Sequence, residues 1–91
     1  MNSIKIDNDI IINTCSNFDN EQKKISLNTN INFIQFHFCL EGKVILNYND
    51  RAYQFQLSEN SSIILFNPST NLPIDGELEK NSKYLSLLIT I

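Results

Sequence analysis

Short apolar runs separated by polar turns are the feature that most limits how this chain can fold. Eight runs rich in Ile, Leu, Phe and Tyr cover residues 9–14, 24–28, 32–41, 43–48, 51–57, 62–66, 74–79 and 83–91. The segments between them are rich in Asn, Asp and Ser, which favour turns. Runs of this length and spacing are typical of the strands of a sandwich or barrel. The sequence therefore predicts an all-β fold with almost no helix, in which residues 1–24 are partly loop.

The size and charge of the chain restrict its partners. Its 91 residues make one domain, 1–91, and a chain of this size buries only about 60 to 65% of its unfolded surface. The net charge is −3, and the one basic pair, Lys23-Lys24, is flanked by Asp19 and Glu21. Proteins that grip nucleic acid carry a basic surface, because neutralising phosphates supplies most of the affinity. We therefore expect no direct contact of this chain with DNA or RNA.

The cysteines and the N-terminal residues indicate the compartment. Two cysteines, Cys15 and Cys39, do not make the disulfide framework of a small secreted domain. The first residues carry acidic side chains within their apolar stretch, unlike a signal peptide. No window approaches the ~18 apolar residues that span a bilayer. We expect a cytoplasmic protein with reduced thiols and no membrane association.

Residues 44–57 contain the clearest local element, a hairpin. Asn49-Asp50 can adopt the positive φ angles of a two-residue turn. The pairs that follow from this turn are Tyr48 with Arg51, Leu46 with Tyr53 and Val44 with Phe55. Tyr48, Tyr53 and Phe55 then form a cross-strand aromatic cluster, which we expect in the core. The other face of the hairpin is mostly polar and is expected to meet water.

Two further runs carry apolar residues on both faces and are expected to be covered on both. In residues 33–40, the set Phe33, Gln35, His37 and Cys39 alternates with the set Ile34, Phe36, Phe38 and Leu40. The run 83–91 has Leu85, Leu87, Ile89 and Ile91 on one face and reaches the last residue without a turn. Apolar surface left open invites aggregation. We expect either a fragment of a longer protein, with an incomplete barrel, or another chain that covers these faces.

Several motifs between Phe33 and Pro68 match a known family. They are Leu40-Glu41-Gly42, the Asn49-Asp50 turn, Tyr53-Gln54-Phe55-Gln56-Leu57 and Ile63-Ile64-Leu65-Phe66-Asn67-Pro68. Over about residues 25–91 the chain resembles the N-terminal domain of AraC-type transcription regulators, a cupin β-barrel of the double-stranded β-helix type. It departs from the family where a Gly-Asp turn is replaced by Glu59-Asn60-Ser61. The resemblance implies a cupin-like sandwich or barrel.

The resemblance also implies where a metal would sit in a related protein. Counting back from the Leu-Glu-Gly step places Gln35 at the position of the ligand glutamate of metal-binding cupins. The two histidine positions before it fall near Asn28 and Asn30, and a later one falls near Asn71 and Leu72. Amides and aliphatic side chains are poor ligands for transition metals. The resemblance thus argues against a metal or other cofactor, and against an enzyme that depends on one.

His37 and Cys39 leave several roles open. As a metal ligand, His37 would use Cys39, about 7 Å away on the same strand face. Alternatively it is a buried histidine that bonds to backbone or to Gln35, or the wall of a pocket. Cys39 is open as a nucleophile with His37 as its base, as a redox partner of Cys15, or as a small core residue. We predict a ligand pocket at Gln35, His37 and Cys39, with no catalytic and no metal-binding residue.

These expectations combine into one leading function. The chain is expected to be the effector-binding and dimerisation domain of an AraC-type regulator, without catalytic activity. In that family the partner subunit or later helices cover the outer face, here Phe36, Phe38 and Leu40. The expected partners are an unknown small-molecule effector, a second copy of the chain, and DNA only through a helix-turn-helix domain not present here. A small cupin enzyme or metalloprotein, and a self-associating β protein that acts alone, remain alternatives.

Overall fold

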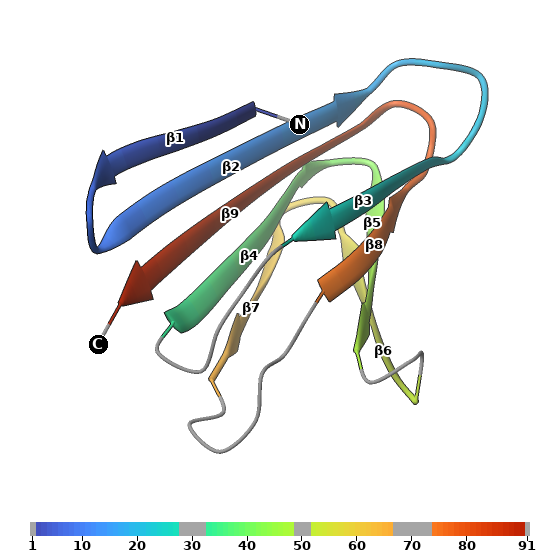
Figure 1. The fold of residues 1–91 in the computed structure, drawn as a ribbon. Helices are drawn as coiled ribbons and strands as arrows, with labels where there is room; N and C mark the ends of the chain where they lie inside the picture. Colours follow the sequence, from blue (N-terminus) through green and yellow to red (C-terminus); the bar gives the residue numbers. More distant parts are fainter. Residues whose placement is uncertain (1, 28–32, 49–51, 67–73, 91) are drawn as a thin grey trace.

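The computed structural model describes residues 2–27, 33–48, 52–66 and 74–90. Within these ranges the chain forms nine strands and no helix, so no described helix could cross a membrane (Figure 1). The strands are β1 (Asn2–Asp7), β2 (Ile10–Asn17), β3 (Lys23–Leu27), β4 (Phe33–Glu41), β5 (Lys43–Tyr48), β6 (Tyr53–Ser58), β7 (Ser61–Leu65), β8 (Ile74–Leu78) and β9 (Ser82–Thr90). The predicted all-β fold is confirmed. Each of the eight predicted runs overlaps one strand, with bounds that differ by up to three residues, and β1 is an additional strand that was not predicted.

The strands form two antiparallel sheets that face each other (Figure 1). The larger sheet has the order β1-β2-β9-β4-β7, and the smaller one has the order β3-β8-β5-β6. On one side β6 contacts both β4 and β7, which brings the two sheets together. On the other side β1 and β3 are the edge strands. The arrangement is a sandwich in which β9 lies between β2 and β4.

The core lies between the sheets, because most strands other than β1 alternate buried and less buried residues. On the smaller sheet, Val44, Leu46 and Leu78 are fully buried, and Leu57 packs with them. On the larger sheet, Leu88 is almost fully buried, but its neighbours on the same face are mostly polar. Strands place successive side chains on opposite faces, so these residues share one interior. The interior is therefore apolar on the wall of the smaller sheet and mixed on the wall of the larger sheet, where Cys15, Cys39 and Tyr84 accompany the polar side chains.

The β5–β6 hairpin differs from the prediction in register. Tyr48 pairs with Tyr53, where the sequence analysis expected Arg51, so the ladder is shifted by two residues. The predicted turn at 49–50 lies outside the described residues. A shift of two residues leaves every side chain on its predicted face, because the period of a strand is two. Tyr48 and Phe55 do pack edge to face, with ring centroids 5.6 Å apart, but Tyr53 is 62% exposed and the prediction that it lies in the core is wrong.

A tight turn at Gly42 joins β4 to β5. Gly42 has φ +74°, a conformation that residues with a Cβ rarely adopt. A Cβ at this position would overlap the Ser82 hydroxyl and lie 2.7 Å from the Asn81 carbonyl oxygen. The Ser82 hydroxyl accepts from the Lys43 amide at 2.9 Å and donates to the Lys43 carbonyl at 3.0 Å. Glycine here allows β9 to approach the end of β4 closely.

Candidate functional site

The three predicted pocket residues lie together on the inner face of β4. Gln35 and Cys39 are 1% exposed and His37 is fully buried. Their alternation with Ile34, Phe36 and Phe38 places them toward the smaller sheet, as the sequence analysis expected. Two cavities that described residues line lie elsewhere and do not include these three side chains. The pocket remains a prediction, and of its three residues Gln35 and His37 hydrogen-bond to each other.

Both ring nitrogens of His37 are engaged in hydrogen bonds. Nδ1 lies 2.5 Å from the Tyr84 hydroxyl, and Nε2 lies 3.0 Å from Oε1 of Gln35. Because Oε1 can only accept, Nε2 carries the proton and Nδ1 accepts from Tyr84. The Tyr48 hydroxyl lies 3.5 Å from Nε2, and the His37 and Tyr84 rings are stacked with centroids 5.9 Å apart. The imidazole is held as one neutral tautomer by β4, β5 and β9.

The hydrogen bonds continue from Tyr84 toward the edge of the larger sheet. Ser86 lies two residues beyond Tyr84 on the same face of β9, and its hydroxyl favours a lower pKa of Tyr84, against the larger effect of burial. Nδ2 of Asn13 donates to the Ser86 hydroxyl at 3.1 Å, and Oδ1 of Asn13 accepts from the Ser3 hydroxyl at 2.6 Å. Every buried side-chain nitrogen or oxygen in the described ranges has a partner. A chain of polar contacts thus connects β1 at the surface to the histidine between the sheets.

Burial keeps this cluster uncharged at neutral pH. Removal of His37 from water lowers its pKa from 6.5 to about 4. Burial likewise raises the pKa of Tyr48 and of Tyr84 well above the usual tyrosine range. Among the described residues, none of the buried side chains is Asp, Glu, Lys or Arg. The interior is polar without carrying a charge.

Cys39 is not arranged as a nucleophile with His37 as its base. Its Sγ donates to the Glu41 carbonyl at 3.3 Å, while the ring nitrogens of His37 bond to other groups. Burial raises the pKa of the Cys39 thiol, and the nearby Glu59 carboxylate raises it further. A thiol that stays protonated is a weak nucleophile. In this arrangement Cys39 is a small core residue beside the histidine.

Cys15 and Cys39 flank Tyr84 on the inner face of the larger sheet. Tyr84 pairs with Cys15 of β2 on one side and with Cys39 of β4 on the other. Two strand spacings separate the Cα atoms by about 10 Å. A disulfide needs Cα atoms within about 7 Å. Both thiols are free, and a direct disulfide between them does not fit this fold.

The side chains considered as metal ligands do not converge. Among the described residues no three His, Cys, Asp or Glu side chains are grouped to hold an ion. Glu41 turns to the surface and forms an ion pair with Lys83 at 3.4 Å. Gln35, at the position of a ligand glutamate in the resemblance, bonds to His37 instead. The other implied positions, Asn28, Asn30, Asn71 and Leu72, lie outside the described residues.

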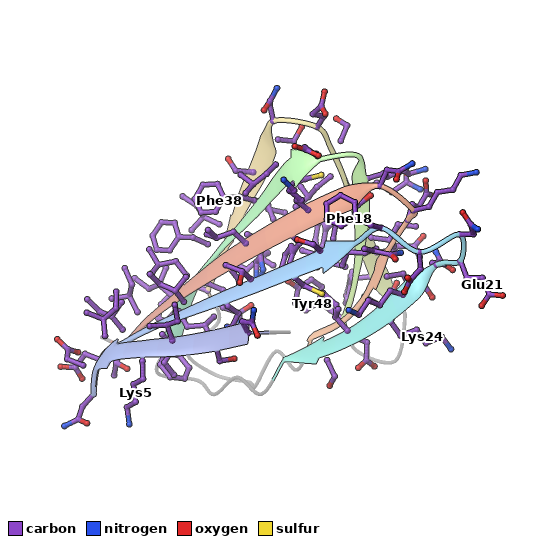
Figure 2. All side chains as sticks on the ribbon, turned by 90° about the horizontal axis from the view of Figure 1, so that it is seen from above. Lys5, Phe18, Glu21, Lys24, Phe38 and Tyr48 are labelled. Carbon is purple, nitrogen blue, oxygen red and sulfur yellow. The ribbon has the colours of Figure 1, made fainter. Side chains whose placement is uncertain are left out.

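The predicted interface residues lie on the outer face of the larger sheet. Figure 2 shows Phe38 on that outer side and Tyr48 between the sheets. Phe36 and Phe38 are half-buried by their neighbours, and Leu40 is 47% exposed. One apolar row crosses all five strands through directly paired residues: Ile4, Ile12, Leu87, Phe36 and Ile64. Ile4 and Ile64 at its two ends are 59% and 63% exposed.

Four residues of the cluster were not predicted as site residues from the sequence: Tyr84, Ser86, Tyr48 and Asn13. Alternation in the run 83–91 separates Tyr84, Ser86 and Leu88 from an all-apolar face, as it separates Gln35 and His37 in β4. This shared pattern of one apolar and one mixed face was the available signal. It identifies residues that face the same interior only when β9 is known to lie beside β4. The adjacency of β4 and β9 brings together residues that are 47 positions apart in the sequence, such as His37 and Tyr84.

Solved structures with the same fold are cupin domains. The cupin domain of Cnp3 from Schizosaccharomyces pombe matches with a TM-score of 0.68 at 15% identity, over 99% of this chain and 59% of that chain. A cupin superfamily protein from Desulfitobacterium hafniense matches with a TM-score of 0.64 at 11% identity, over 98% of this chain and 73% of the other. The EutQ protein of Clostridium difficile matches with a TM-score of 0.58 at 7% identity, over 90% of this chain and 57% of the other. The predicted cupin-like fold is confirmed.

Sequence comparison adds no closer relationship. No family model and no curated protein sequence matches the chain. The chain spans 59% of the Cnp3 chain and 57% of the EutQ chain. At such low identities the likeness establishes the shared fold, and function has to be argued from the residues of this chain.

Proposed function

We propose that this chain is the effector-binding and dimerisation domain of a cytoplasmic AraC-type transcription regulator. In this proposal the domain is not catalytic and controls DNA binding by a C-terminal helix-turn-helix domain outside this chain. The cupin fold supports the proposal, as do the family motifs around Leu40-Glu41-Gly42. The observation that carries it is the buried, uncharged cluster around His37, whose hydrogen bonds suit ligand recognition.

The effector is proposed to bind between the sheets at Gln35, His37 and Cys39. These side chains offer hydrogen-bond donors and acceptors, and no charged side chain is buried among the described residues. A charged effector group would lose its hydration there without a partner, so a small neutral molecule fits best. Because Gln35 and His37 bond to each other, the effector has to replace that bond with its own. It regulates by binding one arrangement of the interior more tightly than another.

The proposed dimer forms through the outer face of the larger sheet, with a second copy as the occupant. The apolar row from Ile4 to Ile64 crosses the whole sheet and carries no charge that would repel an identical surface. A patch five strands wide and about six residues long covers on the order of 500 Å² per copy, or about 1,000 Å² in total. That area is at the lower end of specific interfaces, so we expect a dimer that dissociates on dilution.

The reading frame downstream of Ile91 tests the regulator proposal directly. Two helix-turn-helix patterns after residue 91 would support it, whereas a stop codon with no such domain would contradict it. Metal analysis of protein purified without a tag tests the alternative of a metalloprotein. A stoichiometric transition metal that is lost in His37→Ala would favour that alternative over an effector domain.

Light scattering tests the dimer with a matched pair of variants. Phe36→Asp places a charge in the centre of the apolar row and is expected to shift the protein to a monomer. Ile45→Asp is the control, because Ile45 is similarly half-buried but lies on the outer face of the smaller sheet, between Gln56 and Glu77. Equal effects of the two substitutions, or a monomeric parent protein at high concentration, would contradict the proposed interface.

A further inference from the structure

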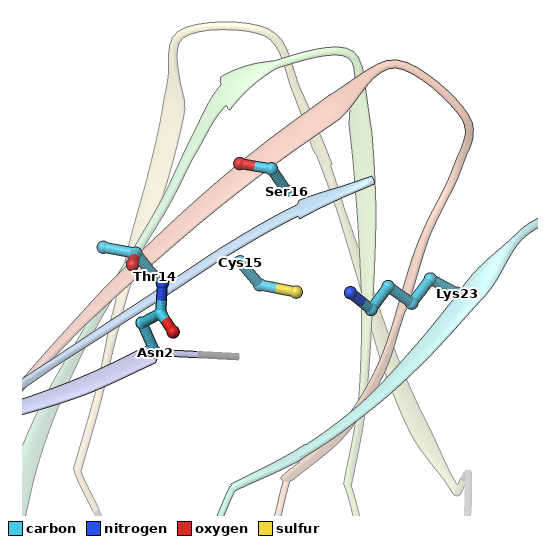
Figure 3. Close-up of a pocket in the computed structure, with 5 residues that line it drawn as sticks. All are labelled: Asn2, Thr14, Cys15, Ser16 and Lys23. Carbon is cyan, nitrogen blue, oxygen red and sulfur yellow. The ribbon is translucent and has the colours of Figure 1, made fainter. Parts of the chain in front are cut away.

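The edge strand β1 is held in the molecule by its pairing with β2. It lies at one margin of the larger sheet and pairs with β2 alone. Figure 3 shows its first residue, Asn2, beside Thr14 of β2. All six residues of β1 are exposed, and its two isoleucines, Ile4 and Ile6, are 59% and 57% exposed. Because no residue of β1 is buried in the core, the ladder with β2 is the main interaction that fixes this strand.

The turn between β1 and β2 lacks the geometry that hairpins favour. It consists of two residues, Asn8 and Asp9. Two-residue hairpin turns favour residues with positive φ, because their twist then matches that of the paired strands. Among the described residues other than glycine, positive φ occurs only at Asn60 and Asn81, in the turns before β7 and β9. The closed hairpin therefore depends on a short turn of a disfavoured type, next to a bulge in the last residues of β1.

One side of this turn already continues the line of β2. The Thr90 amide donates to the Asp9 carbonyl at 2.8 Å, so Asp9 prolongs the ladder between β2 and β9. The return to β1 is held locally by Asp7, whose Oδ1 accepts from the Asp9 amide at 2.6 Å. That contact is exposed, and a hydrogen bond in water contributes only modestly to stability. A change of backbone conformation at Asn8 would thus open the hairpin and leave β2 and β9 paired.

We propose that β1 is exchanged between two copies of this chain. With Asn8 extended, residues 2–17 form one continuous strand, and β1 of each copy pairs with β2 of the other. Every contact of the closed hairpin is then made between chains, including the hydrogen bond from Ser3 to Asn13. The occupant of the β2 edge is a second copy, because it supplies the same residues in the same register. A short, strained hinge favours such an exchange.

The acidic residues at the hinge are compatible with this pairing. In the register of the hairpin, Asp7 of one copy faces Ile10 of the other, and Asp9 faces Asn8. Residues that face each other in a ladder share one side of the ribbon, and successive residues alternate. The carboxylates of the two copies therefore lie on opposite sides of the ribbon. Like charges placed directly opposite would destabilise the pairing, and this register avoids them.

The exchange would connect the second copy to the interior of the first. Asn13 accepts from Ser3 and donates to Ser86 of β9. In the exchanged pair the serine at the outer end of these contacts comes from the partner copy. The proposal differs from the dimer through the outer face, because here the partner contributes a strand to the larger sheet. It is independent of the proposed regulator function, since it uses only the β1–β2 hairpin.

A disulfide between two different chains detects the exchange directly. One preparation carries Lys5→Cys and the other carries Ile11→Cys, because Lys5 and Ile11 pair on the inner face of the hairpin. A dimer through the outer face keeps these two positions of different copies apart. The preparations are mixed at high concentration, incubated, diluted and oxidised, and linked peptides are identified by mass spectrometry. We expect a link between position 5 of one chain and position 11 of the other.

A chain with both substitutions is the control, because its disulfide shows that the geometry of the pair permits the bond. If this control oxidises and the mixed preparations contain no link between chains, the proposal is wrong. A dimer seen by light scattering without that link would leave the outer-face dimer standing and still overturn the exchange.

A matched pair of substitutions at Asp9 tests the turn as the hinge. Asp9→Gly creates an Asn-Gly turn, which favours the closed hairpin, whereas Asp9→Val introduces a β-branched residue, which favours extended backbone. Both remove the same exposed charge and keep the backbone groups that bond to Asp7 and Thr90. Added to the mixed preparations, Asp9→Val is expected to give a several-fold higher yield of the link than Asp9→Gly. Equal yields, or a higher yield with Asp9→Gly, would refute the turn as the hinge of the exchange.

Discussion

Acidification is the perturbation to which the interior cluster responds most specifically. His37 is fully buried, both of its ring nitrogens are bonded, and no buried carboxylate among the described residues could neutralise an imidazolium. Protonation of Nδ1 would turn an acceptor for the Tyr84 hydroxyl into a second donor facing it. Folding therefore selects the neutral ring, and the pKa of His37 falls from 6.5 to about 4.

The sign and size of the effect follow from proton linkage. Between pH 6.5 and 4 the unfolded chain binds a proton at His37 that the folded chain does not, so stability falls as the pH falls through this window. The contribution is fully present above pH 6.5. At about 1.4 kcal/mol per pH unit, the total loss near pH 4 is about 3 kcal/mol, of which about 2 kcal/mol is lost by pH 5. A small domain is stable by only about 5 to 15 kcal/mol, so the loss is substantial.

Urea unfolding from pH 7 to pH 4 measures this contribution when the parent protein is compared with His37→Gln. Glutamine can hydrogen-bond at this position but does not titrate, while all carboxylates remain the same in both proteins. We expect the free energy of unfolding of the parent to fall by about 3 kcal/mol more than that of the variant. Because the chain contains one histidine, its imidazole proton resonance reports the pKa of His37 directly.

Two results would refute the reasoning. Parallel stability curves for the parent and His37→Gln between pH 7 and pH 4 would mean that His37 titrates alike in the folded and unfolded states. An imidazole resonance that titrates near pH 6.5 in folded protein would mean the same. Either result would place His37 in contact with water or with a charged partner, contrary to the buried, neutral cluster described above.

Three substitutions test other parts of the structure by urea unfolding at pH 7. Tyr84→Phe leaves the buried imidazole nitrogen of His37 without its donor and should lower the free energy of unfolding by about 1–3 kcal/mol. Tyr53→Phe, at an exposed ring, is the control and should change stability by less than about 0.5 kcal/mol. Similar losses in the two variants would contradict the assignment of Tyr84 to the cluster. Gly42→Ala forces a side chain into the close approach of β9 at a positive φ and should cost at least about 2 kcal/mol; a neutral result would contradict that turn geometry. Lys83→Ala removes a surface ion pair with Glu41 and should cost less than about 1 kcal/mol, so a larger loss would show a stronger contact than the one described.

Strand positions and faces were predictable because they depend on local alternation. Gln35 and His37 could be placed on one face, and Phe36 and Phe38 on the other, from a period of two alone. The same reasoning missed β1. Both isoleucines of β1 are more than half exposed and neither of its faces is buried, so the strand lacks the contrast that reveals the others.

Contacts between distant strands could not be predicted from alternation. The slip of two residues in the β5–β6 hairpin preserves both faces, so the apolar pattern does not distinguish the two registers. The hydrogen bond between His37 and Tyr84 depends on β9 lying beside β4, which is a property of the topology. The mixed faces of β4 and β9 can each be recognised in the sequence, but the sequence does not show that these two strands are neighbours in the same sheet.

The central position of β9 has a consequence for how the chain acquires its structure. β2 and β4 are made early, yet within the larger sheet they are joined to each other only through β9, and Asn13 bonds to Ser86 at a separation of 73 residues. Pairings this distant in sequence slow folding, because the entropy of closing a long loop is lost before the favourable contacts form. During synthesis, the apolar rows of β2 and β4 therefore exist as separate open edges until β9 emerges. We expect a chain truncated before Ser82 to aggregate, and a chaperone that covers open strand edges to delay this.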